Sequence, residues 1–371
     1  MENDLPLPMP DRRIINTKDY YISIEDINKE ESQNKLKTNI SQFNELKESK
    51  LSVISNAQIK QTEDMRQKIL FYKLLSDKTI YTNSLQSNNK VNKCNLIIFG
   101  PSGGGKTSFI KSLYRALYKT PLLPKNSINE LIIRKKNNNQ GPLLFSQFNL
   151  VKETENNSGI MICNTRGHLN EKVQNKIILD GKIKNGEIIE KIVNRDPNTL
   201  LEFWNKSNES FPKEIFKSKE GGGNIKSLPH SVILIFDGST DEIIKEKDVK
   251  FYQDFIRISK IKGYKDIHVV LSKVDEFEKN IWGKYKYLPE NEILSKINSL
   301  KDIKIERVIT TLGVNRSNVH FIENYHKENK NNNSIEIDYN ILKTIINMLN
   351  TSETYILDKM SKNQNCFGFC F

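Results

Sequence analysis

The chain has 371 residues, of which 37% are hydrophobic, and a formal net charge of +12 from 57 Lys and Arg against 45 Asp and Glu. This length suits one large domain with an extension, or two domains. The four scattered cysteines exclude a disulfide framework. The sequence has no CxxC pair and no cluster of His and Cys, so it gives no indication of a zinc site. The basic excess permits contact with nucleic acid or an anionic membrane. It predicts no specific nucleic acid, because no lysine block is interleaved with aromatic residues.

The first 90 residues show no strand pattern. The first 20 contain three prolines and suit a flexible arm, and the stretch from 25 to 75 lacks Gly and Pro. One or two amphipathic helices are expected there. Two sets of apolar residues fall at helical spacing: Leu36, Ile40 and Phe43, and Met65, Ile69 and Tyr72. These helices either recruit protein partners, as an arm or a coiled coil, or pack against the main domain.

From residue 91 onward, short apolar strands alternate with helix-length segments. Strands are expected at 94–99, 144–151, 159–163, 232–236, 267–271 and 318–322. Continuous apolar strands joined by helices predict an α/β fold, with a mostly parallel sheet covered on both faces. The predicted organisation is a flexible arm at 1–20, a helical extension and linker at 21–90, an α/β domain at 91–352 with an insertion around 186–228, and a flexible tail at 353–371.

A glycine-rich turn follows the first strand and precedes a helix expected at 105–118. Residues 100–107 read GPSGGGKT and match the phosphate-binding pattern G-x-x-x-x-G-K-[ST]. Glycines let backbone N–H groups curl around phosphate oxygens, and the helix N-terminus adds a favourable dipole. Lys106 is expected to reach the terminal phosphates, as a catalytic residue, and Thr107 to bind Mg²⁺. The predicted nucleotide-binding residues here are Gly100, Pro101, Ser102, Gly103, Gly104, Gly105, Lys106, Thr107 and Ser108.

A candidate for reading the base follows the strand at 267–271. Residues 272–275 read SKVD, where GTP-binding domains typically carry N/T-K-x-D. The carboxylate of Asp275 can accept two hydrogen bonds from the N1–H and 2-amino groups of guanine, which adenine does not offer. Lys273 is expected to pack its stem along the base, and Ser272 keeps the hydroxyl that Thr would supply.

Between these two motifs, residues 164–167 read NTRG, where a GTPase carries D-x-x-G. The N–H of Gly167 is expected to sense the γ-phosphate. Asn164 replaces the aspartate that holds Mg²⁺ through water, and its amide brings no negative charge, so weaker Mg²⁺ binding and slower hydrolysis are predicted. His168 either orients the attacking water, as a catalytic residue, or is a surface histidine.

The remaining candidates around the metal are less sharply defined by pattern. Ser146 and Thr154 are the nearest hydroxyls for a second, switch-type ligand to Mg²⁺. Asp237 closes the strand at 232–236. It is a metal-binding carboxylate if the protein is an ATPase, and a structural residue if the protein is a GTPase.

Several segments together resemble the GTP-binding domain of the interferon-induced protein 44 family. They read FGPSGGGKTSFIKSL, CNTRGH, ILDGKIKNGE, HSVILIFDGS, VVLSKVDE and NVHFIENYH, and they cover roughly residues 90 to 350. The resemblance implies a Ras-like α/β fold, binding of GTP or GDP with Mg²⁺, and a cytoplasmic location. It also places Asn324 and Tyr325 in the last loop that contacts guanine.

Three functional hypotheses follow. The first is a guanine-nucleotide-binding switch with slow GTP hydrolysis, and the second is a GTP-binding scaffold with little hydrolysis that recruits partners through its N-terminal helices. The third is a P-loop ATPase or kinase that uses Asp237. No apolar run approaches the roughly 18 residues of a membrane span. The C-terminal segment with its two cysteines is either acylated, which would add contact with a membrane surface, or a frayed tail.

Overall fold

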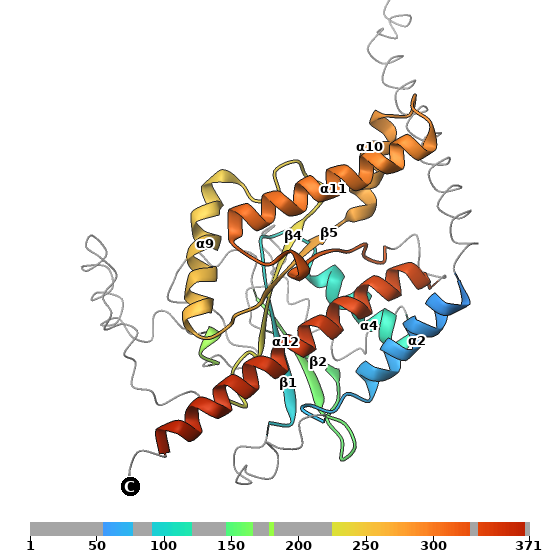
Figure 1. Cartoon of the computed structure of the whole chain (residues 1–371). Helices are drawn as coiled ribbons and strands as arrows, with labels where there is room; N and C mark the ends of the chain where they lie inside the picture. The colour runs from blue at the N-terminus through green and yellow to red at the C-terminus, as the bar shows by residue number, and fades with distance from the viewer. Residues whose placement is uncertain are drawn as a thin grey trace, which may run out of the picture.

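A computed structural model of the chain describes residues 55–76, 91–120, 146–165, 178–181, 225–326 and 333–367. Figure 1 shows a central sheet flanked by helices. The helices are α2 (Asn56–Leu70), α4 (Lys106–Tyr118), α9 (Glu246–Ile261), α10 (Val274–Lys284), α11 (Glu290–Leu312) and α12 (Ile335–Phe367). The strands are β1 (Lys93–Phe99), β2 (Ser146–Val151), β3 (Gly159–Asn164), β4 (Ser231–Asp237), β5 (Ile267–Ser272) and β6 (Val319–Phe321), with a short 3₁₀ turn, η4 (Arg316–Asn318), before β6.

The six strands form one sheet in the order β2-β3-β1-β4-β5-β6. Every neighbouring pair is parallel except β2 and β3, which form an antiparallel pair with a bulge between Asn149 and Val151. Each strand predicted from the sequence is present within a few residues of its expected bounds. The predicted fold class, an α/β domain with a mostly parallel sheet covered by helices, is confirmed.

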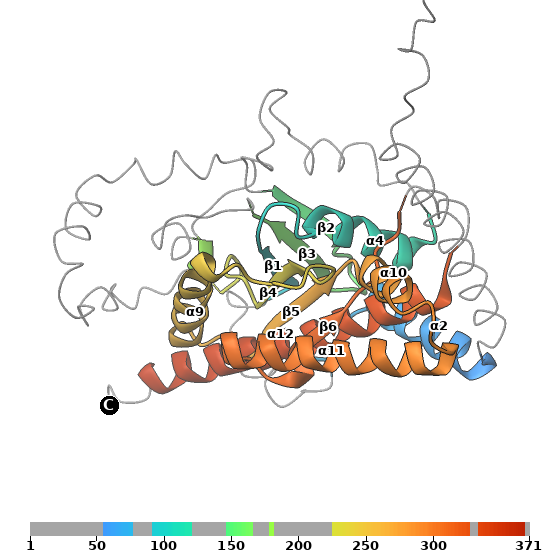
Figure 2. The ribbon, with the colours of Figure 1, turned by 90° about the horizontal axis from the view of Figure 1, so that it is seen from above.

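Alternate residues of the central strands enter different cores. On β1, Leu96 and Ile98 lie in the core shared with α4 and α12, whereas Ile97 and Phe99 lie in the core shared with α9 and α11. Because both faces of the sheet are covered, the parallel strands are mostly apolar, as expected for parallel sheets, and the polar side chains of Asn95 on β1 and His268 on β5 are buried. Figure 2, seen from above, shows α4 on one side of the strands and α9 on the other.

Helix α2 packs on the domain beside α12 and α4 (Figure 1). It begins at Ser55, whose side chain accepts a hydrogen bond from the Gln58 N–H, a standard N-cap. Its Ile69 is fully buried, and Tyr72, just beyond its end, is 7% exposed within the main core. The N-terminal helices were expected either to recruit partners or to pack against the main domain, and α2 packs against the main domain. The helix expected around Leu36 lies outside the described residues.

The predicted flexible tail from residue 353 is wrong. Helix α12 continues to Phe367, and Ile356 and Met360 are buried against Val91 and Leu75. Burial of these apolar side chains keeps the C-terminal part of α12 packed on the domain. In the sequence, the polar residues between them hid this apolar face. The arm at 1–20, the linker at 82–90 and most of the insertion at 186–228 lie outside the described residues. No described helix is long and apolar enough to cross a membrane.

Candidate nucleotide-binding site

The predicted site residues gather at one edge of the sheet. Strands β1, β3, β4 and β5 are parallel, so their carboxyl ends meet there. The chain passes from β1 to β3 on one side and to β4 on the other, which makes this edge a topological switch point, where ligands of open α/β sheets bind. The loop after Phe99, Asn164, Asp237 and Ser272 all lie at this edge.

The loop between β1 and α4 has a backbone that only glycine fits at two points. Gly100 has φ of 140°, and a Cβ atom there would lie 2.1 Å from the carbonyl oxygen of Ile235. Gly105 has φ of 94°, and a Cβ atom would lie 2.6 Å from the Ser272 hydroxyl oxygen. The backbone of the loop therefore lies directly against the ends of β4 and β5, too close for a Cβ atom at Gly100 or Gly105.

Lys106 closes this loop on itself. Its Nζ donates hydrogen bonds to the carbonyl oxygens of Gly100, at 2.8 Å, and Pro101, at 2.9 Å. The side chain is buried, and this burial lowers the pKa of Lys106 to about 8. The ammonium group thus lies inside the turn where a phosphate would be cradled. Thr107 is half-buried in the first turn of α4, and Ser102 and Ser108 are exposed.

Ser272 joins β5 to the same loop. Its hydroxyl donates a hydrogen bond of 2.8 Å to the carbonyl oxygen of Gly104. The amide nitrogen Nδ2 of Asn324 lies 3.5 Å from the position that a Cβ of Gly105 would take. Asn324 is 1% exposed, and its Oδ1 has no hydrogen-bond partner within the described part of the chain. The loop after β6 therefore borders the glycine-rich turn.

Asp275 lies in the first turn of α10 and is 4% exposed. Its Oδ2 is 3.0 Å from Nε2 of His326, and this hydrogen bond raises the pKa of His326. The expected base-reading carboxylate is therefore held by a side chain from the loop after β6. Sequence reasoning missed His326, because only the fold brings this loop beside α10, and its position two residues after Asn324 was the sole available signal.

Lys273 does not extend along an open site in this structure. It has φ of 60° and forms an ion pair with Asp237, on the neighbouring strand end. Asp237 also accepts hydrogen bonds from the N–H of Ser239, at 2.9 Å, and from its hydroxyl, at 2.6 Å. Burial opposes ionisation of Asp237, but the hydrogen bonds from Lys273 and Ser239 prevail and lower its pKa. Both carboxylate oxygens are therefore engaged by protein groups.

Asn164 ends β3 directly beside β1, opposite Ile98. It is 1% exposed, and neither Oδ1 nor Nδ2 of its amide finds a hydrogen-bond partner among the described residues. A buried amide with no partner costs about 1–3 kcal/mol per group. The amide is thus suited to a ligand, or a water on a ligand, at this edge. Gly167 and His168 lie outside the described residues.

The two hydroxyl candidates for a second metal ligand separate in space. Ser146 begins β2 directly opposite Asn164 in the antiparallel pair, so its backbone lies at the carboxyl edge. Thr154 lies in the turn before Gly159, which is opposite Lys93 at the start of β1. That turn is roughly 20 Å from the glycine-rich loop along a seven-residue strand. Thr154 is therefore wrong as a metal ligand, because the hairpin carries it to the other edge.

The described residues contain no group of three or more His, Cys, Asp or Glu side chains that could hold a metal ion by themselves. The donors present, the Thr107 hydroxyl and the Asn164 amide, instead fit Mg²⁺ of the kind that is bound mainly by phosphates and waters. The residues at this edge thus fit a magnesium–nucleotide complex better than a dedicated metal cage.

Searches against protein-family models and against curated proteins found no match. Among solved structures, the chain is similar to the Ski7 GTPase-like domain of S. cerevisiae, bound to GDP and inorganic phosphate, with 12% identity and a TM-score of 0.34 over 68% of this chain and 50% of that one. Toc33 of Arabidopsis thaliana, in complex with Mg²⁺ and GMPPNP, matches with 10% identity and a TM-score of 0.34 over 82% and 95%. Sup35 complexed with GMPPNP matches with 12% identity and a TM-score of 0.27 over 67% and 40%. The chain thus spans half of the Ski7 structure that it matches.

Proposed function

We propose that the protein binds GTP and GDP with Mg²⁺, as its resemblance to the interferon-induced protein 44 family implies, and that it acts as a conformational switch with slow GTP hydrolysis. One observation carries this proposal. The phosphate-type loop at 100–107, the buried carboxylate of Asp275 and the amide of Asn164, which has no hydrogen-bond partner among the described residues, all lie at the same carboxyl edge of the sheet.

The phosphates would occupy the glycine-rich turn. Lys106 would leave the carbonyl oxygens of Gly100 and Pro101 and donate to phosphate oxygens, which restore an opposite charge to its buried ammonium. The N-terminus of α4 directs backbone N–H groups at the same place. The hydrogen bond from Ser272 to Gly104 holds this loop against β5, so the phosphate and base sites keep a constant separation.

The base would be selected by Asp275. A buried carboxylate that accepts hydrogen bonds from the N1–H and 2-amino groups of guanine discriminates strongly against adenine, because adenine leaves that carboxylate unpaired. The two carboxylate oxygens offer about four acceptor sites, so Asp275 can receive guanine while His326 stays on Oδ2 and holds the carboxylate in place. Asn324, buried beside Gly105, would contact the same nucleotide with its Oδ1, which has no hydrogen-bond partner in the described part of the chain.

Hydrolysis is proposed to be slow because of Asn164. Mg²⁺ lowers the barrier by neutralising charge on the transferred phosphoryl group. Thr107 would bind the ion directly, and the amide of Asn164 would accept a hydrogen bond from one of its waters without adding negative charge. His168 is kept as the candidate for orienting water. A single-turnover comparison with Asn164→Asp separates this proposal from the scaffold alternative: an acceleration supports a weakened enzyme, and no hydrolysis in either protein supports the scaffold.

The ATPase or kinase alternative would need Asp237 at the metal. Its carboxylate instead accepts two hydrogen bonds from Ser239 and pairs with Lys273. Freeing it would break all three contacts, so guanine-nucleotide binding is favoured.

Calorimetric titration of the full chain with GDP, ADP and XDP tests the proposal. Wild-type protein is expected to bind GDP and to bind ADP at least 100-fold more weakly, since two hydrogen bonds to a charged group contribute about 1.5–3 kcal/mol each. Asp275→Asn is expected to lose a similar factor for GDP and to prefer XDP. Glu276→Gln is the matched control, because it removes the same charge from the neighbouring exposed position. Equal binding of GDP and ADP would refute the role of Asp275.

A further inference from the structure

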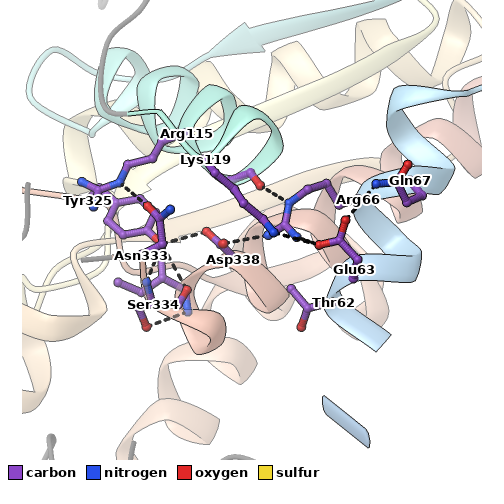
Figure 3. Close-up of polar contacts among 12 residues, drawn as sticks. Thr62, Glu63, Arg66, Gln67, Arg115, Lys119, Tyr325, Asn333, Ser334 and Asp338 are labelled. Carbon is purple, nitrogen blue, oxygen red and sulfur yellow. Dashed lines mark hydrogen bonds and ion pairs between the residues drawn. The ribbon is translucent and has the colours of Figure 1, made fainter. Parts of the chain in front are cut away.

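A buried polar network joins α2 to the loop at 322–326, which borders the proposed base site (Figure 3). We propose that Arg66 of α2 is a positioning residue for guanine-nucleotide binding: through Asp338 and Tyr325 it holds that loop, so that docking of α2 and occupation of the base site are coupled. This inference rests on the proposed function and adds an N-terminal helix to the nucleotide-binding unit.

Each of the three nitrogens of the Arg66 guanidinium has a partner. Its Nε donates to the carbonyl oxygen of Ala116 in the last turn of α4, at 2.7 Å, and Nη2 donates to Oδ2 of Asp338, at 2.8 Å. Nη1 pairs with Glu63 on α2 itself. Arg66 is 5% exposed and Asp338 is 3% exposed. One side chain thus connects α2 both to the helix that follows the phosphate loop and to the start of α12.

Asp338 passes the connection to Tyr325. Its second oxygen, Oδ1, accepts a hydrogen bond of 2.7 Å from the Tyr325 hydroxyl. The same hydroxyl accepts a 2.9 Å hydrogen bond from the N–H of Ser334. Because each oxygen of Asp338 binds a different partner, the carboxylate sets the distance between α2 and the ring of Tyr325 (Figure 3).

Tyr325 is fixed to α4 as well. Its backbone N–H donates to the hydroxyl of Ser112, at 2.8 Å, and the guanidinium of Arg115 lies 3.8 Å from its ring centroid. The two residues on either side of it reach the proposed site: Asn324 borders Gly105, and His326 binds Asp275. Tyr325 is therefore the anchor of a short loop whose other side chains lie at the base site.

This arrangement differs from ordinary surface docking of a helix. An exposed ion pair contributes little and transmits little. Here, loss of Arg66 would leave the Asp338 carboxylate buried without its cationic partner, and the carboxylate would then change its hydrogen bonds to Tyr325. The expected consequence is a displaced Asn324 and His326. The phosphate loop, held separately by the Ser272 hydroxyl and by the Lys106 ammonium, would keep its geometry.

Two ligands separate these effects in the full chain, since GDP contacts both sites and inorganic tripolyphosphate contacts the phosphate loop alone. Arg66→Gln and Tyr325→Phe are each expected to weaken GDP binding about tenfold, within the usual range of coupling between sites, and to leave tripolyphosphate binding within about twofold. The Phe variant keeps the ring and removes only the hydroxyl, so it tests the network even where Arg66→Gln fails to fold. Lys119→Ala is the matched control, because Lys119 pairs with Glu63, at 3.1 Å, at the exposed rim of the network rather than with Asp338 or Tyr325.

Hydrogen exchange gives the reciprocal measurement, since coupling acts in both directions. GDP is expected to slow amide exchange in α2, and tripolyphosphate is expected to leave it unchanged. The coupling would be overturned if Arg66→Gln and Tyr325→Phe weakened the binding of GDP and of tripolyphosphate equally, or left GDP binding unchanged. In that case GDP binding by the wild-type protein would still uphold the proposed function. Wild-type protein that binds tripolyphosphate but not GDP would overturn the proposed function itself, and the coupling with it.

Discussion

Nucleotide affinity is expected to fall at alkaline pH because of Lys106. Burial lowers its pKa to about 8, and within the described residues its hydrogen bonds go to neutral carbonyl oxygens. Phosphate oxygens favour the charged ammonium and raise this pKa on binding. Binding therefore takes up a proton whenever Lys106 is neutral beforehand. The fraction protonated falls from about 90% at pH 7 to about 25% at pH 8.5, so the GDP affinity is expected to fall about fourfold over this range.

Calorimetry at pH 7, 7.5, 8 and 8.5, in buffers of different ionisation enthalpy, measures both the affinity and the proton uptake. The terminal phosphate, with a pKa of about 6, is ionised throughout. Lys106→Arg supplies the reference, because its guanidinium stays charged. The ratio of the two affinities isolates Lys106 from His326, which also titrates and pairs with Asp275. A ratio that stays constant from pH 7 to 8.5, or no proton uptake near pH 8, would refute the reasoning.

Two further predictions concern stability. Gly100→Ala is expected to lower the free energy of unfolding by about 2 kcal/mol or more, because its Cβ meets the carbonyl of Ile235, whereas Gly103→Ala, with positive φ but open space, is expected to lose about 1 kcal/mol. Equal losses in urea denaturation would contradict this steric explanation. Burial keeps three histidines neutral in the folded state. It lowers the pKa of His230 to about 4, of His268 to about 3 and of His320 to about 4. In the unfolded chain these rings bind protons below pH 6.5. The free energy of unfolding is therefore expected to be highest above pH 6.5 and to fall toward pH 4 by up to about 1.4 kcal/mol per pH unit for each ring. A urea denaturation midpoint that is unchanged between pH 7 and 5 would contradict this prediction.

Local pattern was sufficient for the strands, the fold class and the phosphate-type loop. A buried parallel strand shows itself as an apolar run, and the glycine-rich turn needs its residues at consecutive positions, so both signals lie within short windows. The same windows misplaced two features. The polar residues of α12 suggested a tail although Ile356 is buried, and closeness in sequence suggested Thr154, which the hairpin carries to the other edge.

What the sequence alone determined is the set of groups on which the proposed chemistry depends: a loop with the phosphate-binding pattern, a carboxylate in an SKxD motif, and an asparagine where GTPases usually carry an aspartate. Only the tertiary structure decided which of these groups meet. The contact of His326 with Asp275 spans 51 residues, and that of Arg66 with Asp338 spans 272. Such pairs depend on the order of the strands and on helices packed across the sheet, and these arise from apolar burial summed over the whole domain, which no short stretch of sequence contains.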